Sequence, residues 1–143
     1  MTVEPFWVQV NEGSLRQGDY PPGCLVPTFA VDFGLSPGQS EVATDTADLI
    51  VVTQSCDLEQ RKVRLVAACP FFSLVEFEAV NSAFARKGRW NEVLKGRIEG
   101  LHLLASPVSP EDNRQSLVVD FREIYSLPHG YLADHAARLG ARW

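Results

Sequence analysis

The feature that most constrains the fold is an unbroken apolar run, Leu49-Ile50-Val51-Val52, which is followed by Thr53. Such a run, rich in β-branched residues, is typical of a strand that is buried on both faces. We therefore expect this strand to be central in a sheet, with Ile50 and Val52 on one face and Val51 on the other. An exposed edge strand of this composition would promote aggregation.

A second apolar run, from Val63 to Cys69, follows after a short polar connection and is followed by Pro70. The connection is too short to hold a helical crossover, so we expect the two strands to be antiparallel neighbours. Proline has no backbone N–H group to donate to a neighbouring strand. We therefore expect the second strand to end at Pro70.

The segment before these strands has an apolar half and a polar half. Phe29, Val31 and Phe33 alternate with other residues, which predicts a half-buried strand within Cys24 to Phe33. The stretch 35–48 is polar and contains proline and glycine, which predicts a mobile loop.

After Pro70 the apolar residues recur with a helical period. They predict a first helix capped by Ser73, a second helix after Gly88, and a last short helix from Tyr131 to Leu139. The residues expected on the buried faces of the first two helices are Leu74, Phe77, Val80 and Phe84, then Trp90, Val93, Leu94, Ile98 and Leu101. Further strands are expected at 101–105 and 117–120.

The order of these elements favours an α+β fold. We expect one domain over residues 1–143, with a small, mostly antiparallel sheet curled into a partial barrel and two or three helices on one side. A doubly wound sheet is disfavoured because strands and helices do not alternate along the chain. With 45% hydrophobic and 22% charged residues, the composition is that of a globular domain.

Composition also narrows the classes of function. Three cysteines without paired spacing favour a reducing compartment, and the N-terminal residues do not have the pattern of a secretory signal, so we expect a cytoplasmic protein. No apolar run is long enough for a membrane span. The cysteines and the three histidines, His102, His129 and His135, have no metal-ligand spacing, and no nucleotide-binding glycine motif is present. We expect neither a metal nor a cofactor.

The residues that follow the Leu49 strand are the first candidates for chemistry. Thr53, Ser55, Cys56 and Asp57 are candidate catalytic residues, because strand ends commonly carry reactive groups. A thiol becomes a nucleophile only near a basic group or a helix N-terminus. The alternative, which we favour, is that Cys56 is a small buried side chain and that Asp57 caps a turn.

A basic segment, residues 84–97, is the second candidate. It carries five positive residues and one negative residue, whereas the whole chain has a net charge of -5. Such a patch around an aromatic ring could bind a phosphate backbone and stack a base. The alternative is that Trp90 belongs to the core and the basic residues are solvated. The candidate nucleic-acid-binding residues are Arg86, Lys87, Arg89, Lys95 and Arg97.

Two resemblances accompany these motifs. The stretch Leu49-Ile-Val-Val-Thr-Gln-Ser-Cys-Asp-Leu58 resembles a group of uncharacterised bacterial proteins with a hydrophobic strand followed by T/S-Q-S/T-C-D. Gly18-Asp19 precedes a strand, a later strand ends in hydroxyl residues at Thr53 and Ser55, and the next ends near Pro70. This layout has a distant likeness to the PemK/MazF-like toxins, which are SH3-like barrels that cleave RNA. That likeness implies an SH3-like partial barrel and a toxin–antitoxin role. Where those toxins carry Arg-Pro, this sequence has Thr46-Ala47-Asp48, so the arginine expected to stabilise the phosphoryl transition state is missing there.

Three functional hypotheses follow. The first is a regulatory module without catalytic activity that binds another protein or a second copy of itself. The second is an RNA-cleaving nuclease, in which Thr53 or Ser55, Asp57 and a basic residue such as Arg61 or Arg64 would share a groove with the basic segment. The third is thiol chemistry at Cys56. Large apolar residues offered as interface anchors for the first hypothesis are Phe71, Phe72, Tyr125, Tyr131 and Trp143.

Overall fold

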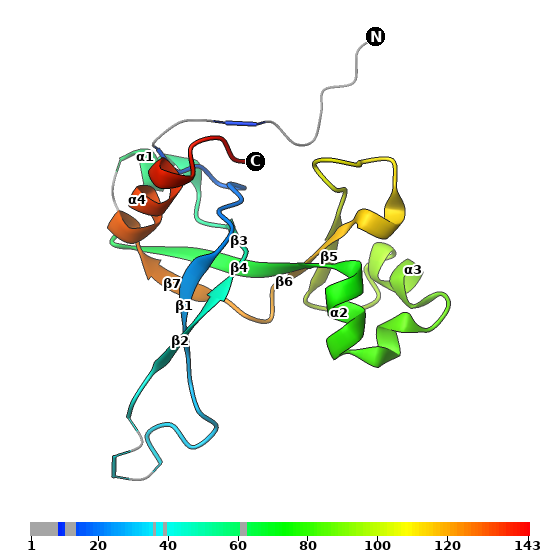
Figure 1. Ribbon diagram of the computed structural model, residues 1–143, viewed down its shortest axis with the longest axis horizontal. Coiled ribbons are helices and arrows are strands. Elements are labelled where there is room, and N and C mark those ends of the chain that lie inside the picture. Colours follow the sequence, from blue (N-terminus) through cyan, green and yellow to red (C-terminus); the bar gives the residue numbers. More distant parts are fainter. Residues whose placement is uncertain (1–8, 11–13, 36, 39, 61–62) are drawn as a thin grey trace.

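Strand β4 (Leu65–Ser73) organises the fold, because it pairs with three other strands. The structure is a computed structural model that describes residues 9–10, 14–35, 37–38, 40–60 and 63–143 (Figure 1). Its other elements, in chain order, are β1 (Cys24–Thr28), β2 (Ala43–Ala47), β3 (Leu49–Val51), α1 (Ser55–Glu59), α2 (Leu74–Val80), the 3-10 helix η1 (Ser82–Ala85), α3 (Arg89–Leu94), β5 (Leu101–Leu104), the 3-10 helix η2 (Asn113–Gln115), β6 (Leu117–Asp120), β7 (Tyr125–Pro128) and α4 (His129–Leu139).

All pairings in the sheet around β4 are antiparallel. Ala68 of β4 pairs with Val51 of β3 and with Tyr125 of β7, so these two strands lie on opposite edges of β4. Strand β6 pairs with the last three residues of β4, and β5 pairs with β6. The prediction of an α+β fold with a small antiparallel sheet is confirmed.

Pro70 does not end β4, contrary to the prediction. The strand continues through this residue to Ser73, and Pro70 pairs with Leu49 of β3. On the other edge, β7 pairs up to Ala68 and β6 begins opposite Phe71, so Pro70 lies in the gap between the two partner strands. The missing N–H group therefore removes no hydrogen bond from a sheet ladder.

Strand β3 is the end strand of the sheet, so the prediction that it is central is wrong. The irregular segment 18–21 covers its outer edge, where Val51 N donates to Asp19 O at 2.9 Å and Gly18 N donates to Val51 O at 2.8 Å. This backbone cover satisfies the edge without a further strand. The predicted faces are confirmed, because Val51 packs in one apolar cluster and Ile50 and Val52 pack against another.

The segment 24–47 forms a two-stranded hairpin, β1–β2, that projects from the body (Figure 1). Strand β2 occupies part of the stretch predicted to be a loop. The half-buried strand predicted within Cys24 to Phe33 is present as β1, but it ends at Thr28, so the alternating residues Phe29, Val31 and Phe33 lie beyond it and are exposed. Only the root of the hairpin is packed, with Cys24 and Val26 in the core.

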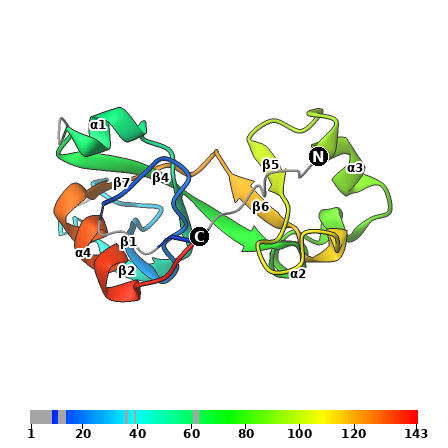
Figure 2. The ribbon, with the colours of Figure 1, turned by 90° about the horizontal axis from the view of Figure 1, so that it is seen from above.

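The helices lie at both ends of the sheet rather than on one side, which corrects the predicted arrangement. Helices α1 and α4 lie at one end of the long axis, and α2 and α3 lie at the other (Figures 1 and 2). Each end has its own core, one around Leu49, Val66 and Leu132 and the other around Phe77 and Val118. Strand β4 runs through both, because Val66 belongs to the first core while Ser73 adjoins α2.

The predicted helical faces are confirmed only in part. Ser73 caps α2 as expected, since its hydroxyl accepts a hydrogen bond from Glu76 N at 3.1 Å. Val80 and Leu94 are exposed, and Phe84 lies in the separate helix η1. Ile98 and Leu101 lie beyond the second helix, which ends near Gly96, whose φ is 71°. A left-handed residue of this kind commonly terminates a helix.

The sheet does not close into a barrel among the residues that the structure describes, because the β1–β2 hairpin is a separate two-stranded sheet. The partial barrel expected from the sequence is therefore not formed by these strands. In the same residues, no helix is long and apolar enough to cross a lipid bilayer.

Candidate functional site

The hydroxyl groups after β3 make structural hydrogen bonds. Thr53 Oγ1 accepts a hydrogen bond from Ala67 N at 2.8 Å, and Ser55 Oγ accepts one from Gln17 N at 2.9 Å. Both acceptors hold backbone segments in place around the end of β3. Ser55 thus binds a backbone amide that is distant in sequence.

Cys56 is exposed in the first turn of α1, so the expectation of a small buried side chain is wrong for this residue. The other two cysteines, Cys24 and Cys69, are buried. Burial, with a contribution from the charge of Asp48, raises the pKa of the Cys24 thiol to about 12. Burial and the charge of Asp120 also raise the pKa of the Cys69 thiol. Cys56 is therefore the accessible thiol among the three.

Little around Cys56 resembles a catalytic site. Its Sγ lies 3.8 Å from Gln54 Oε1, and Leu58 fills the space beneath α1 with its side chain in the core. Asp57 lies in the first turn of α1 and does not cap the helix. Arg64 is exposed, and Arg61 lies outside the described residues.

The basic segment lies on η1 and α3, at the opposite end of the molecule from α1 (Figures 1 and 2). The structure therefore does not bring the Thr53–Asp57 residues and the basic segment into one groove, which the nuclease hypothesis requires. This separation follows from the length of β4, which connects the two ends.

Trp90 packs against the core around Phe77 and Val118, as the alternative interpretation of the basic segment predicted. Its ring packs against Phe77 and Phe84 with centroid distances of 5.7 and 5.0 Å. Its Nε1 donates to Glu78 Oε1 at 2.7 Å, and Arg114 also donates to this carboxylate. The hydrogen bonds from Arg114 and then from Trp90 lower the pKa of Glu78. The indole ring is thus held in place by ring packing and a hydrogen bond, and it is half-buried.

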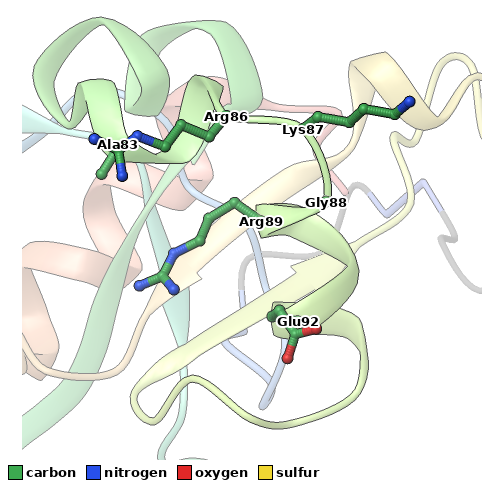
Figure 3. A pocket seen from close by; sticks show the side chains of 6 residues that line it. All are labelled: Ala83, Arg86, Lys87, Gly88, Arg89 and Glu92. Carbon is green, nitrogen blue, oxygen red and sulfur yellow. The ribbon is translucent and has the colours of Figure 1, made fainter.

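A cavity of about 500 Å³ lies beside the turn between η1 and α3 (Figure 3). Its lining residues are Ala83, Arg86, Lys87, Gly88, Arg89 and Glu92. Three of the five predicted basic residues therefore gather at this cavity. Arg97 does not line the cavity, but it forms an ion pair at 3.1 Å with Glu92, which does.

The tip of the β1–β2 hairpin carries a group of exposed apolar side chains that was not identified as a site from the sequence. Phe29 is 59% exposed and Leu35 is 78% exposed, and Val31 is fully exposed. Phe29 and Phe33 form an edge-to-face pair with a centroid distance of 4.8 Å. The alternation of Phe29, Val31 and Phe33 was the available signal, but it was interpreted as a half-buried strand.

The aromatic residues offered as interface anchors are not exposed. Phe71 is buried in the third apolar cluster, where it packs against Tyr20, and Phe72, Tyr125, Tyr131 and Trp143 are half-buried. Tyr131 also accepts a hydrogen bond from Leu25 N at 2.7 Å through its hydroxyl group. These side chains stabilise the body of the protein.

The hairpin is also acidic. Residues 17–60 include no lysine or arginine. At the base of the hairpin, Asp48 accepts a hydrogen bond from Gly23 N at 2.9 Å, and the hairpin itself carries Asp32, Glu41 and Asp45. The surface thus combines exposed apolar side chains with negative charge.

No cluster of three or more histidine, cysteine, aspartate or glutamate side chains suited to a metal ion occurs in the described part of the chain. Comparisons of the chain with family models, with curated proteins and with solved structures found no match.

Proposed function

We propose that this protein is a non-catalytic binding module whose β1–β2 hairpin docks on a protein partner that presents a basic and apolar surface. The observation that carries the proposal is the exposure of Phe29, Val31 and Leu35 at the tip of the projecting hairpin. Soluble monomers rarely expose a contiguous apolar patch unless it is a site of interaction.

The energetics of the hairpin support this proposal. An isolated two-stranded hairpin is only marginally stable in water, and here only the root, at Cys24 and Val26, is packed on the core. Burying the distal apolar side chains in an interface would contribute favourable free energy, on the order of 25 cal/mol per Å² of apolar surface. Burial of these side chains therefore contributes free energy to the binding of a partner, whereas it contributes little to the folding of the free protein.

The charge of the hairpin specifies the partner. Asp32, Glu41 and Asp45 face no lysine or arginine of their own segment, so a basic partner surface complements them. A second copy of the same hairpin would bring like charges together. The proposal therefore places a different protein on this surface, and it accords with a regulatory role in the cytoplasm.

The test compares three immobilised proteins: the wild type, the hairpin variant F29S/V31S, and the control V80S. Val80 is also exposed, at 84%, but lies on α2 at the other end of the molecule. A protein captured from the source cell is purified and titrated against each. We expect the hairpin variant to bind at least about tenfold more weakly, because buried aromatic anchors dominate interfaces. The control should bind as the wild type does.

High salt should weaken the wild-type complex, because the acidic residues steer a basic partner. Equal affinity of all three proteins for the purified partner would contradict the proposal. So would a hairpin-dependent dimer in analytical ultracentrifugation, since it would identify a second copy as the occupant.

RNA cleavage and thiol chemistry at Cys56 stay predictions. Incubation with single-stranded RNA tests the first, and alkylation at neutral pH tests the second.

A further inference from the structure

We infer that the cavity between η1 and α3 binds the phosphate group of a small phosphate monoester, with Arg86 and Arg89 as its principal donors. This site lies on a different part of the molecule from the β1–β2 hairpin and does not depend on its role. The inference rests on the cavity itself, on the charges of Arg86 and Arg89, which no described carboxylate pairs, and on the packing of the Trp90 ring against Phe77 and Phe84.

The cavity is an open hollow of about 500 Å³, in which five of the six lining residues are exposed, so a small polar group can enter it from solvent. Figure 3 shows the Arg86 and Arg89 side chains pointing to the same side of the turn, whereas Lys87 points away from them. Two guanidinium groups on one side can each donate paired N–H groups to phosphate oxygens.

The positive charge in the cavity is not compensated by the protein. Among the described residues, Arg86 and Arg89 form no ion pair with a carboxylate. Glu92 is the acidic residue of the lining, and its carboxylate receives two hydrogen bonds from Arg97, at 3.1 and 3.2 Å. A dianionic group would therefore meet two guanidinium groups whose charges are free to pair with it.

Arg89 is also oriented by a contact that leaves its charge available. Its guanidinium carbon lies 5.1 Å from the centroid of the Phe84 ring, a cation–π arrangement. Phe84 in turn is fixed in the core by Phe77, at a centroid distance of 5.1 Å. This packing restricts the side chain of Arg89 before a ligand arrives, which lowers the entropic cost of binding.

The same contacts favour a single phosphate over a nucleic-acid strand. A single-stranded nucleic-acid site needs a basic track and aromatic rings on which bases stack. Here Arg89 lies over Phe84, Trp90 is packed between Phe77 and Phe84, and Arg97 is neutralised by Glu92. The charges of Arg86, Lys87 and Arg89 therefore gather at one turn of the chain, and that of Lys95 lies outside the cavity lining.

The test is a titration of the full chain by two-dimensional ¹H–¹⁵N NMR, with inorganic phosphate and glycerol phosphate as probes and sodium chloride at matched ionic strength as the blank. We expect saturable shifts of the Lys87 and Gly88 amide signals with both probes. The variant R86Q should weaken binding by about tenfold, because it removes a charge-assisted contact. The variant K95Q loses the same charge outside the cavity lining and should bind as the wild type does.

Three results would overturn the inference. The first is shifts that do not saturate or that sodium chloride reproduces. The second is equal weakening by R86Q and K95Q, which would mean that only net charge matters. The third is binding of single-stranded oligonucleotides that strengthens with their length while both small phosphates fail to bind, which would identify a nucleic-acid surface instead. The exposure of Arg86 makes a folding defect in R86Q unexpected, and the dispersion of the same spectra checks this.

Discussion

Replacing Arg142 by methionine should destabilise the protein strongly, because it breaks a buried ion pair. The Arg142 side chain is 2% exposed and that of Asp19 is 7% exposed, and Arg142 Nη2 lies 3.0 Å from Asp19 Oδ2. The same nitrogen donates to Ser14 O at 3.0 Å, and Asp19 Oδ2 also accepts a hydrogen bond from Arg16 N at 3.0 Å. Methionine keeps much of the volume but leaves the Asp19 carboxylate buried without its cation.

The expected loss is large. Removing one partner of a buried ion pair costs about 3–5 kcal/mol, because the remaining charge stays desolvated. At roughly 2.1 cal/mol/K per residue, the unfolding entropy of a chain of 143 residues is about 300 cal/mol/K. The melting temperature should therefore fall by roughly 10–17 °C.

Thermal and urea denaturation, followed by circular dichroism, measure this loss. The matched control is R138M, because Arg138 pairs with Asp134 at 2.7 Å while both side chains are exposed, at 78% and 59%. Exposed pairs of this kind contribute only about 0.3–0.5 kcal/mol. The double variant D19N/R142M should recover part of the loss, since it buries no unpaired carboxylate. An R142M variant no less stable than R138M would refute the reasoning.

Three further predictions concern single groups. Cys56 should react with a thiol reagent in the folded protein while the two buried cysteines react only after denaturation, so an unreactive native protein would contradict the assigned exposure. Burial alone would raise the pKa of Asp120, but the hydrogen bonds from the Arg122 side chain and backbone outweigh it and lower the pKa. The wild type should therefore be more stable than D120N above the ordinary aspartate pKa, and this difference should shrink as the pH falls through the lowered pKa of Asp120. Urea denaturation at several pH values measures the difference, and a difference that does not change with pH would argue against this assignment. Finally, S73A removes the acceptor for Glu76 N and should cost about 1 kcal/mol of unfolding free energy, whereas an unchanged denaturation midpoint would mean that the cap is dispensable.

Local sequence patterns predicted an element correctly where neighbouring residues alone decide its structure. The apolar run at Leu49 predicted a strand with the correct face for each residue, and the stretch 117–120 is the strand β6 as expected. Ser73 predicted the start of α2, because an N-cap serine accepts a hydrogen bond from the amide three residues further along the chain. Trp90 was correctly considered for the core from its helical register with Val93.

The candidate sites were located by sequence only in part. The concentration of positive charge in residues 84–97 pointed to the segment that contains the cavity at Arg86 and Arg89. It could not show that Glu92 neutralises Arg97, because such pairing depends on side-chain geometry. Thr53 and Ser55 looked reactive as a motif, yet both hydroxyls accept hydrogen bonds from backbone amides distant in sequence.

The sequence by itself determined the strands at 49–51 and 117–120, the cap of α2 and the charge of each segment, because these depend on neighbouring residues. Only the tertiary structure decided which strand is central, since Pro70 is tolerated in β4 only because the partner strands leave a gap beside it. It also decided that Phe29 and Val31 are exposed, because alternation sets the two faces of a strand but not whether a second layer covers one of them. The Asp19–Arg142 pair joins residues 123 positions apart, and a contact of that range exists only once the chain has folded.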